Sequence, residues 1–230
     1  MNFDKEAETK EWYKSYYEKK GSLRNNLFNK QVQFQHLAYE KCWIDAHRNV
    51  SLTSKILDVG GGGGAGLLRY IQAGFNPKNL YLVDIIEDRV NEAKNKLPSV
   101  ISAIHGDASD LNAFESKFFD VVTSSTMFIQ LTDEILANKI GCEMVRVLKD
   151  DGRLLIFDWK YDFFREGYMA VNNARLIRIF GNDVIIKVTF KGQLLPPIGR
   201  FFSQYASSLY FLIQKLPFAT GLFCYEIVKK

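Results

Sequence analysis

Short apolar runs alternate with segments of helical periodicity between residues 55 and 159 of this 230-residue chain. The runs show no polar alternation, which is typical of strands buried on both faces of a sheet. Helices of about 10–15 residues between such strands predict a parallel sheet, so we expect a doubly wound α/β fold. The five runs are KILDV at 55–59, NLYLVDI at 79–85, VISAIHGD at 100–107, FFDVVTSS at 118–125 and DGRLLIFDW at 151–159.

Two further strands are expected after this region, at 183–191 and 221–230. The complete prediction is a Rossmann-like, doubly wound, mostly parallel seven-stranded sheet with helices on both faces. Residues 1–50 are predicted as an N-terminal helical extension, a cap or lid over the main domain at 51–230. Within that domain, residues 192–218 are predicted as a helical insertion before the last strand.

Three helices carry more specific predictions. Apolar residues recur at every fourth position between Gln31 and Arg48, which predicts an amphipathic helix. The segment 132–148 is a strong helix for which we expect Thr132 to be the N-cap. Within the insertion, residues 196–216 are expected to form a turn and one long apolar helix.

The composition suits one well-packed domain, because 47% of the residues are hydrophobic. No uncharged apolar stretch reaches 18 residues, and the N-terminus lacks the apolar core of a signal peptide, so we expect no membrane span. Cys42, Cys142 and Cys224 are far apart and show no metal-ligand spacing. We therefore expect no disulfide, no metal site and a reducing, cytoplasmic location.

The C-terminal third is basic and aromatic. From Trp159 onward ten Lys/Arg and four Asp/Glu give a net charge of +6, although the whole chain carries only +4. Such a segment favours an anionic ligand or peripheral contact with a membrane surface, and ordinary solubilising charge gives the same composition. The apolar segment 196–216 is also compatible with burial in the core or in a homodimer.

Polar residues stand at the carboxyl end of all five apolar runs. In doubly wound folds ligands bind at this edge of the sheet, so the pattern predicts a binding site there. The residues concerned are Asp58 with Gly60, Asp84, Asp107, Ser124 with Ser125, and Asp158.

Five consecutive glycines follow the first strand, in DVGGGGGAG. The run lies between an apolar strand and an apolar helix, which excludes a flexible linker, and no Gly-Lys-Ser/Thr follows, which excludes a P-loop. Two patterns overlap: Gly61, Gly63 and Gly66 fit the dinucleotide fingerprint GxGxxG, whereas Gly60, Gly62 and Gly64 continue a DxGxGxG pattern from Asp58. Asp84 suits both, since a carboxylate at the second strand can accept from ribose hydroxyls.

Two other positions favour the second pattern. Asp58 would crowd a pyrophosphate but suits a ligand with a cationic amino-acid end, and Asp107 can accept from an exocyclic adenine amine. We therefore expect Gly60, Gly62 and Gly64 to be the functional glycines and the GxGxxG pattern to be a by-product of the run.

The ordered series from Asp58 to "VLKDDGRLLIFDW" resembles the motifs of class I S-adenosylmethionine (SAM)-dependent methyltransferases over about residues 50–160. The resemblance implies an enzyme that binds SAM, with the glycine loop under its methionine part, Asp84 at the ribose and Asp107 at the adenine. The implied cofactor-binding residues are Asp58, Gly60, Gly61, Gly62, Gly64, Asp84, Ile85, Asp107, Ala108 and Ser124.

The C-terminal part, with Pro196, Pro197 and Arg200, is similar to small bacterial methyltransferases encoded among genes for surface polysaccharides. This resemblance implies O-methylation of a saccharide or sugar-linked intermediate, hence a small-molecule or glycan acceptor and no nucleic-acid partner. The alternatives are a methyltransferase for another small metabolite, a non-catalytic SAM-binding module, and an NAD(P)-dependent oxidoreductase. The last would need a Tyr-x-x-x-Lys pair or similar, and residues 126–150 contain no tyrosine.

The acceptor side offers fewer candidates. Asp158 is a candidate general base or a structural carboxylate, and His105 is a candidate base or a packed strand residue. Arg200 is expected either to bind a phosphate or to form a salt bridge. The predicted acceptor-lining residues are Thr126, Phe128, Gln130, Tyr13 and Arg200, with core packing as the alternative for Phe128.

Overall fold

The computed structural model describes residues 28–162, 166–216 and 218–230. It contains a seven-stranded sheet in the order β3-β2-β1-β4-β5-β7-β6. The first five strands pair in parallel, and β7 is antiparallel to both β5 and β6. This confirms the predicted mostly parallel, doubly wound fold. The strands are β1 (Ile56–Val59), β2 (Leu80–Asp84), β3 (Ser102–His105), β4 (Phe119–Ser125), β5 (Leu148–Trp159), β6 (Val184–Lys191) and β7 (Leu222–Lys229).

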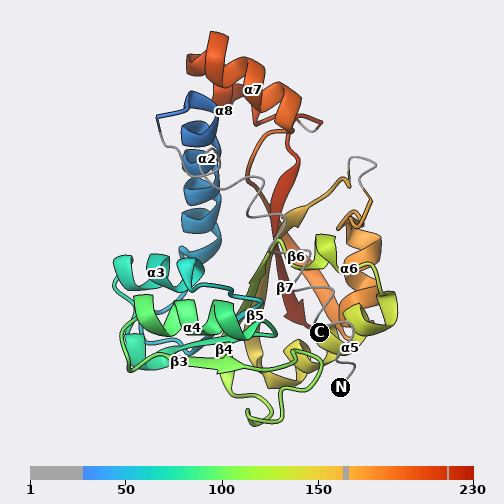
Figure 1. Cartoon of the computed structure of the whole chain (residues 1–230). Helices are drawn as coiled ribbons and strands as arrows, with labels where there is room; N and C mark the ends of the chain where they lie inside the picture. The colour runs from blue at the N-terminus through green and yellow to red at the C-terminus, as the bar shows by residue number, and fades with distance from the viewer. Residues whose placement is uncertain (1–27, 163–165, 217) are drawn as a thin grey trace.

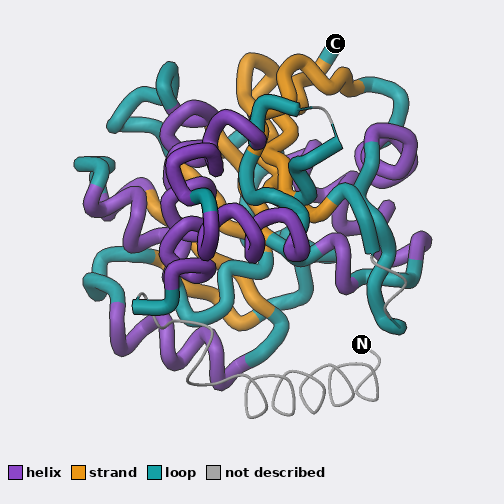
Figure 2. Tube along the Cα trace, turned by 90° about the horizontal axis from the view of Figure 1, so that it is seen from above, coloured by secondary structure: helices purple, strands orange, loops and turns teal. Residues whose placement is uncertain are grey.

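Helices cover both faces of the sheet (Figures 1 and 2). Buried side chains of α2, α3 and α4 form one core with one face, and those of α5 and α6 form a second core with the other. The helices are α2 (Lys30–His47), α3 (Ala65–Gln72), α4 (Glu87–Lys96), α5 (Glu134–Val147), α6 (Asn173–Phe180), α7 (Pro196–Tyr205) and α8 (Tyr210–Ile213), with short 3-10 helices η1 (Pro77–Asn79), η2 (Phe128–Gln130) and η3 (Ser207–Leu209).

The predicted N-cap of α5 is wrong by one residue. Asp133, not Thr132, caps this helix, because its Oδ1 accepts hydrogen bonds from the backbone N–H of Ile135 at 3.0 Å and Leu136 at 3.1 Å. A carboxylate satisfies these free N–H groups and also interacts favourably with the helix dipole.

The predicted long helix at 196–216 is also wrong, because the segment is broken into α7, η3 and α8. Ala206 interrupts it with φ −146° and ψ 52°, outside the helical region. The break lets the chain turn back, so that the Tyr210 ring lies 5.0 Å from the Phe34 ring of α2. Ala38 and Leu194 join Tyr210 in a small core of their own. We call residues 196–216 and Phe218, which lie between β6 and β7, the insertion.

Among the described helices, none is both long and apolar enough to cross a membrane.

Candidate active site at the carboxyl edge of the sheet

The glycine loop between β1 and α3 depends on backbone conformations that favour glycine. Gly60, Gly62 and Gly64 have φ values of 70°, 52° and 79°. Residues with a side chain rarely adopt this left-handed region, so each of the three positions calls for glycine on conformational grounds. These are the three glycines that the sequence singled out.

Asp84 at the end of β2 holds this loop in place. Its Oδ2 accepts a hydrogen bond from the Gly62 N–H at 2.8 Å, and its Oδ1 accepts one from the Ile86 N–H at 2.9 Å. The Gly60 N–H also donates to the Val83 carbonyl oxygen at 2.9 Å. Burial raises the pKa of the Asp84 carboxyl, and the two backbone hydrogen bonds partly oppose this rise. The end of β2 therefore fixes the path of the loop after β1.

Asp58 lies beneath the loop and is nearly inaccessible, with 5% of its surface exposed. Burial, reinforced by the negative charge of Asp84, raises the pKa of its carboxyl to about 7, while Arg69 acts in the opposite direction. Among the described residues, no cation lies within ion-pair distance of this carboxylate. A buried carboxylate in this state is well placed to receive a cationic group of a ligand.

The GxGxxG pattern is not a mere by-product of the run, which corrects our expectation. A Cβ on Gly66 would lie 2.5 Å from Asp58 Oδ2, and one on Gly61 would lie 2.9 Å from the same atom. These two glycines therefore let the loop and the first turn of α3 close over Asp58. The two overlapping patterns have different roles. Gly60, Gly62 and Gly64 allow the backbone turn, whereas Gly61 and Gly66 leave room for the Asp58 carboxylate.

The end of β3 lies beside that of β2. The Gly106 N–H donates to the Asp84 carbonyl oxygen at 3.0 Å, which brings Asp107 and Ala108 to the same edge. Asp107 Oδ1 accepts from the Ser109 N–H at 2.8 Å, so the carboxylate orders its own turn. His105 is exposed rather than packed inside the strand, and its Nε2 donates to the Ile85 carbonyl oxygen at 3.0 Å.

The end of β4 combines an unsatisfied hydroxyl with a strained backbone. The Ser124 side chain is fully buried, and its Oγ has no hydrogen-bond partner. Thr126 has a φ of 55°, a conformation that is unusual for a β-branched residue, and its N–H donates to the Phe157 carbonyl oxygen at 2.7 Å. Such features are concentrated at functional sites, where surrounding contacts hold the strained conformation.

Asp158 at the end of β5 is engaged with backbone. Its Oδ1 accepts from the Trp159 N–H at 2.9 Å, and its Oδ2 accepts from the Ile129 N–H at 3.2 Å. Burial raises the pKa of this carboxyl to about 7. These contacts anchor η2, so the geometry favours the structural alternative for Asp158 over a general base.

The predicted acceptor-lining residues separate in the structure. Phe128 is fully buried and its ring packs 5.5 Å from that of Phe180, which favours the core-packing alternative for this residue. Gln130 donates from Nε2 to the Thr126 carbonyl oxygen at 3.0 Å, and its buried Oε1 has no partner. Arg200 is exposed on α7. Tyr13 and the first 27 residues of the predicted extension lie outside the described residues.

Arg175 on α6 is only 1% exposed and was not among the site residues predicted from sequence. Its Nη1 donates to the carbonyl oxygens of Phe128 at 2.9 Å and Met169 at 2.7 Å, and its Nη2 donates to that of Leu131. The guanidinium thus holds the segment after β4. Arg175 stands four residues before Ile179, so it falls on the apolar stripe of α6. This position could have indicated from sequence that its side chain is buried.

Tyr39 on α2 was also missed. Its hydroxyl lies 3.0 Å from Ser125 Oγ, and its ring packs 5.4 Å from that of Phe157. The guanidinium of Arg69 lies 4.8 Å from the centre of the Tyr39 ring and is paired with Glu40 at 2.5 Å. Tyr39 therefore ties α2 to the end of β4, at the same edge as the glycine loop.

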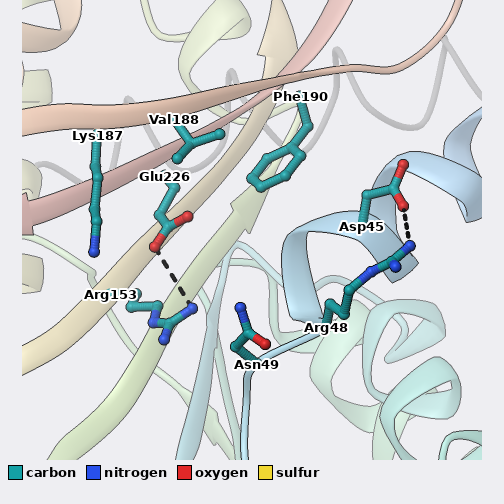
Figure 3. A pocket seen from close by; sticks show the side chains of 8 residues that line it. All are labelled: Asp45, Arg48, Asn49, Arg153, Lys187, Val188, Phe190 and Glu226. Atoms are coloured by element: carbon teal, nitrogen blue, oxygen red, sulfur yellow. Dashed lines mark hydrogen bonds and ion pairs between the residues drawn. The ribbon is translucent and has the colours of Figure 1, made fainter.

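A separate pocket of about 480 Å³ lies between the end of α2 and the strands β5, β6 and β7 (Figure 3). Four of its charged side chains form two ion pairs, Arg48 with Asp45 at 2.9 Å and Arg153 with Glu226 at 3.5 Å. Arg153 stands five residues before Asp158 on β5, so this pocket is not the edge at which the glycine loop lies. Across the described ranges, no group of three or more His, Cys, Asp or Glu residues is placed to hold a metal ion.

Comparison with known proteins shows a similarity to methyltransferases. Residues 57–156 match the family model for a methyltransferase domain. The PH0226 protein from Pyrococcus horikoshii OT3 has a similar fold, with a TM-score of 0.67 and 16% identity over 94% of this chain and 99% of that one. Magnesium protoporphyrin IX methyltransferase from Synechocystis PCC 6803, solved with bound SAM, gives a TM-score of 0.59 at 18% identity. The match covers 95% of this chain and 91% of that one. Residues 57–156 therefore match a methyltransferase domain, and the fold is that of methyltransferases of known structure.

The curated relatives are more specific in name. The ubiquinone/menaquinone biosynthesis C-methyltransferase UbiE of Vibrio vulnificus (strain YJ016) is 25% identical over 169 residues, which are 70% of this chain and 56% of that protein. Its counterpart in Vibrio parahaemolyticus is 31% identical over 110 residues, 46% of this chain and 41% of that protein. The chain thus spans about half the length of the curated relatives that it matches.

Proposed function

We propose that this protein transfers the methyl group of SAM to a small-molecule acceptor at the carboxyl edge of the sheet. The observation that carries the proposal is the unit made by Asp58, the left-handed glycines and Asp84, in which a buried carboxylate lies under a loop free of side chains. This unit falls within the part of the chain that matches the methyltransferase domain.

The residues at this edge suit SAM. Asp58 would receive the cationic amino group, and Gly60, Gly61, Gly62 and Gly64 would lie under the methionine part. When bound, SAM supplies a methyl group already activated by the sulfonium charge. Asp84, beside Ile85, keeps lone pairs for the ribose hydroxyls in addition to its two backbone hydrogen bonds.

The remaining cofactor residues have matching chemistry. Asp107, beside Ala108, would accept from the exocyclic amine of adenine, since its Oδ2 is not used by the turn to Ser109. The Ser124 hydroxyl, buried and unsatisfied, would gain a polar partner from the ligand.

Alignment of the acceptor with the methyl group is the main catalytic contribution that we propose for this chain. Good alignment alone is worth about 7–11 kcal/mol of barrier. The Asp158 oxygens already hold backbone N–H groups, so we do not propose this carboxylate as a general base. We propose that Thr126 and Gln130, which are joined by a hydrogen bond, shape the acceptor side. Arg175 and Tyr39 hold this segment through their contacts with Phe128 and Ser125.

Two acceptor classes follow from two different observations. The resemblance of the C-terminal part, including Pro196 and Pro197, to methyltransferases of polysaccharide gene clusters supports a saccharide hydroxyl. The curated relatives are named C-methyltransferases of ubiquinone and menaquinone biosynthesis, and this supports a carbon acceptor in an intermediate of that kind. Reaction with SAM carrying a 13C-labelled methyl group separates the two, because O-methyl and C-methyl carbons have distinct NMR shifts.

Calorimetric titration with S-adenosylhomocysteine and with NADH tests the cofactor. We expect the first to bind and the second not to bind. Asp84→Asn should weaken S-adenosylhomocysteine binding at least 10-fold, while Asp151→Asn, at an exposed position, serves as the control. Binding of NADH alone, or equal affinity of wild type and Asp84→Asn, would refute the assignment.

A further inference from the structure

The insertion exposes a group of large apolar side chains. Tyr205 is 74% exposed, and the Phe201 ring, 56% exposed, lies 5.5 Å from it on the same side of α7. Contiguous exposed apolar surface of this kind marks an interaction site rather than ordinary surface. The exposed residues are Phe201, Tyr205, Leu209, Leu212, Leu216 and Phe218, and we call them the apolar rim.

The charged side chains of the insertion have one sign. No Asp or Glu occurs between Asp183 and Glu226, a stretch that contains the whole insertion. Arg200 and Lys215 are exposed within the insertion itself. Lys191 lies beside it and donates from Nζ to the Lys215 carbonyl oxygen at 2.5 Å, which adds positive charge at the end of α8. A partner of this surface is therefore apolar and anionic.

The insertion stands at the end of the sheet that carries the site. Its last residues lead into β7, whose first residue, Leu222, pairs with Trp159 at the carboxyl end of β5. The Lys160 N–H donates to the Gly221 carbonyl oxygen at 2.9 Å at the same place. Figure 1 shows α7 and α8 projecting beyond this end of the sheet, beside the beginning of α2.

We propose that the insertion binds the surface of an anionic lipid bilayer. Aromatic and aliphatic side chains on short helices enter the boundary between headgroups and acyl chains, while Arg and Lys beside them bind anionic headgroups. The lack of acidic residues within the insertion distinguishes it from a surface helix such as α4, where Glu92 forms ion pairs with Arg89 and Lys96.

This binding mode narrows the acceptor class. It rests on the proposed function, because a methyltransferase site held against a bilayer receives acceptors that partition into lipid. The acceptor that fits is an amphiphile with its methylated group near the headgroup level, for which both a lipid-linked saccharide and a lipid-tailed quinone intermediate qualify.

Flotation with vesicles tests the proposal on the full chain. Vesicles of phosphatidylcholine with phosphatidylglycerol in a 3:1 ratio are compared with vesicles of phosphatidylcholine alone. We expect the protein to float mainly with the anionic vesicles and to be released by high salt. Arg200→Glu with Lys215→Glu should lower the partition coefficient at least about 25-fold, since each basic residue near such a surface contributes about fivefold.

An apolar pair of substitutions separates insertion from simple charge attraction. Phe201→Ser with Leu212→Ser should lower partitioning about 10-fold or more, because both side chains are more than half exposed in the free protein. Ile135→Ser on α5, at a position 74% exposed, and Lys94→Glu on α4 are the matched controls and should float as the wild type does.

Absence of flotation by the wild type, or equal losses in the insertion and control variants, would overturn the proposal. A dimer by analytical ultracentrifugation that the Phe201 and Leu212 substitutions dissociate would assign the surface to a second copy instead. Titration of every variant with S-adenosylhomocysteine keeps the proposals apart, since retained cofactor binding without flotation defeats only the membrane inference.

Discussion

Replacement of Asp58 by Asn is predicted to make the ligand-free protein more stable and at the same time a poorer binder of S-adenosylhomocysteine. The carboxylate is 5% exposed, carries a raised pKa of about 7 and has no described cation at ion-pair distance, so its ionised form destabilises the fold. Asparagine has nearly the same shape without the charge.

The magnitude follows from the two pKa values. In the unfolded chain the group has its ordinary value of 3.8, and in the folded protein the value is about 7. The native state thus binds the proton more tightly, and its stability declines as pH rises from 3.8 to 7. The raised pKa of Asp58 therefore costs about 2 kcal/mol at pH 5, where the native carboxyl is held protonated, and about 4 kcal/mol at pH 8, where it is ionised.

Urea unfolding of both proteins at pH 5 and pH 8, followed by circular dichroism, measures this difference. The gain from Asp58→Asn should be about twice as large at pH 8 as at pH 5, with Asp151→Asn as the exposed control. Loss of stability in Asp58→Asn at pH 8, or a difference independent of pH, would show that the buried charge is compensated and refute the reasoning. Calorimetry should show at least a 10-fold loss of S-adenosylhomocysteine affinity in the same variant.

Three further perturbations follow from the geometry. Gly66→Ala places a Cβ 2.5 Å from Asp58 Oδ2 and should lower both the melting temperature and S-adenosylhomocysteine affinity, whereas Gly106→Ala, whose nearest neighbour would be 3.5 Å away, should change neither strongly; equal effects would contradict the packing argument. Arg175→Met leaves three backbone carbonyls without their donor and should cost about 3 kcal/mol or more in urea unfolding, whereas Arg178→Met, at a side chain 63% exposed, should cost less than 1 kcal/mol. Burial lowers the pKa of His47 from 6.5 to about 4, so the contribution of the neutral imidazole to stability is complete above pH 6.5 and is lost as pH falls towards 4. Over this range the free energy of unfolding of the wild type should fall by about 3 kcal/mol relative to that of His47→Gln. Parallel pH profiles of the two proteins would disprove this prediction.

Most of the sheet could be predicted from sequence because buried parallel strands leave a direct signal. The five runs are mainly apolar and carry a polar residue at the same end, namely Asp58, Asp84, Asp107, Ser125 and Asp158, so both the strands and the edge of the site follow from local pattern.

The errors arose where tertiary contacts decide. Helical propensity alone favours one helix through Ala206, but packing of Tyr210 on Phe34 breaks it. Thr132 and Asp133 are both good N-caps, and only the path of the chain selects between them. The sequence around Arg175 does not indicate that its guanidinium reaches the carbonyl oxygens of Phe128 and Leu131, more than 40 residues earlier.

The antiparallel β7 separates two parts of this fold that can change independently during evolution. The cofactor edge is built by parallel strands whose order and register constrain one another, whereas the insertion leaves and rejoins the sheet through the hairpin-like pair β6 and β7 at its border. Changes of length or sequence between Pro196 and Phe218 therefore leave the glycine loop and its carboxylates in place. The acceptor specificity and the membrane binding that we propose can therefore change through this segment, while the cofactor site stays the same.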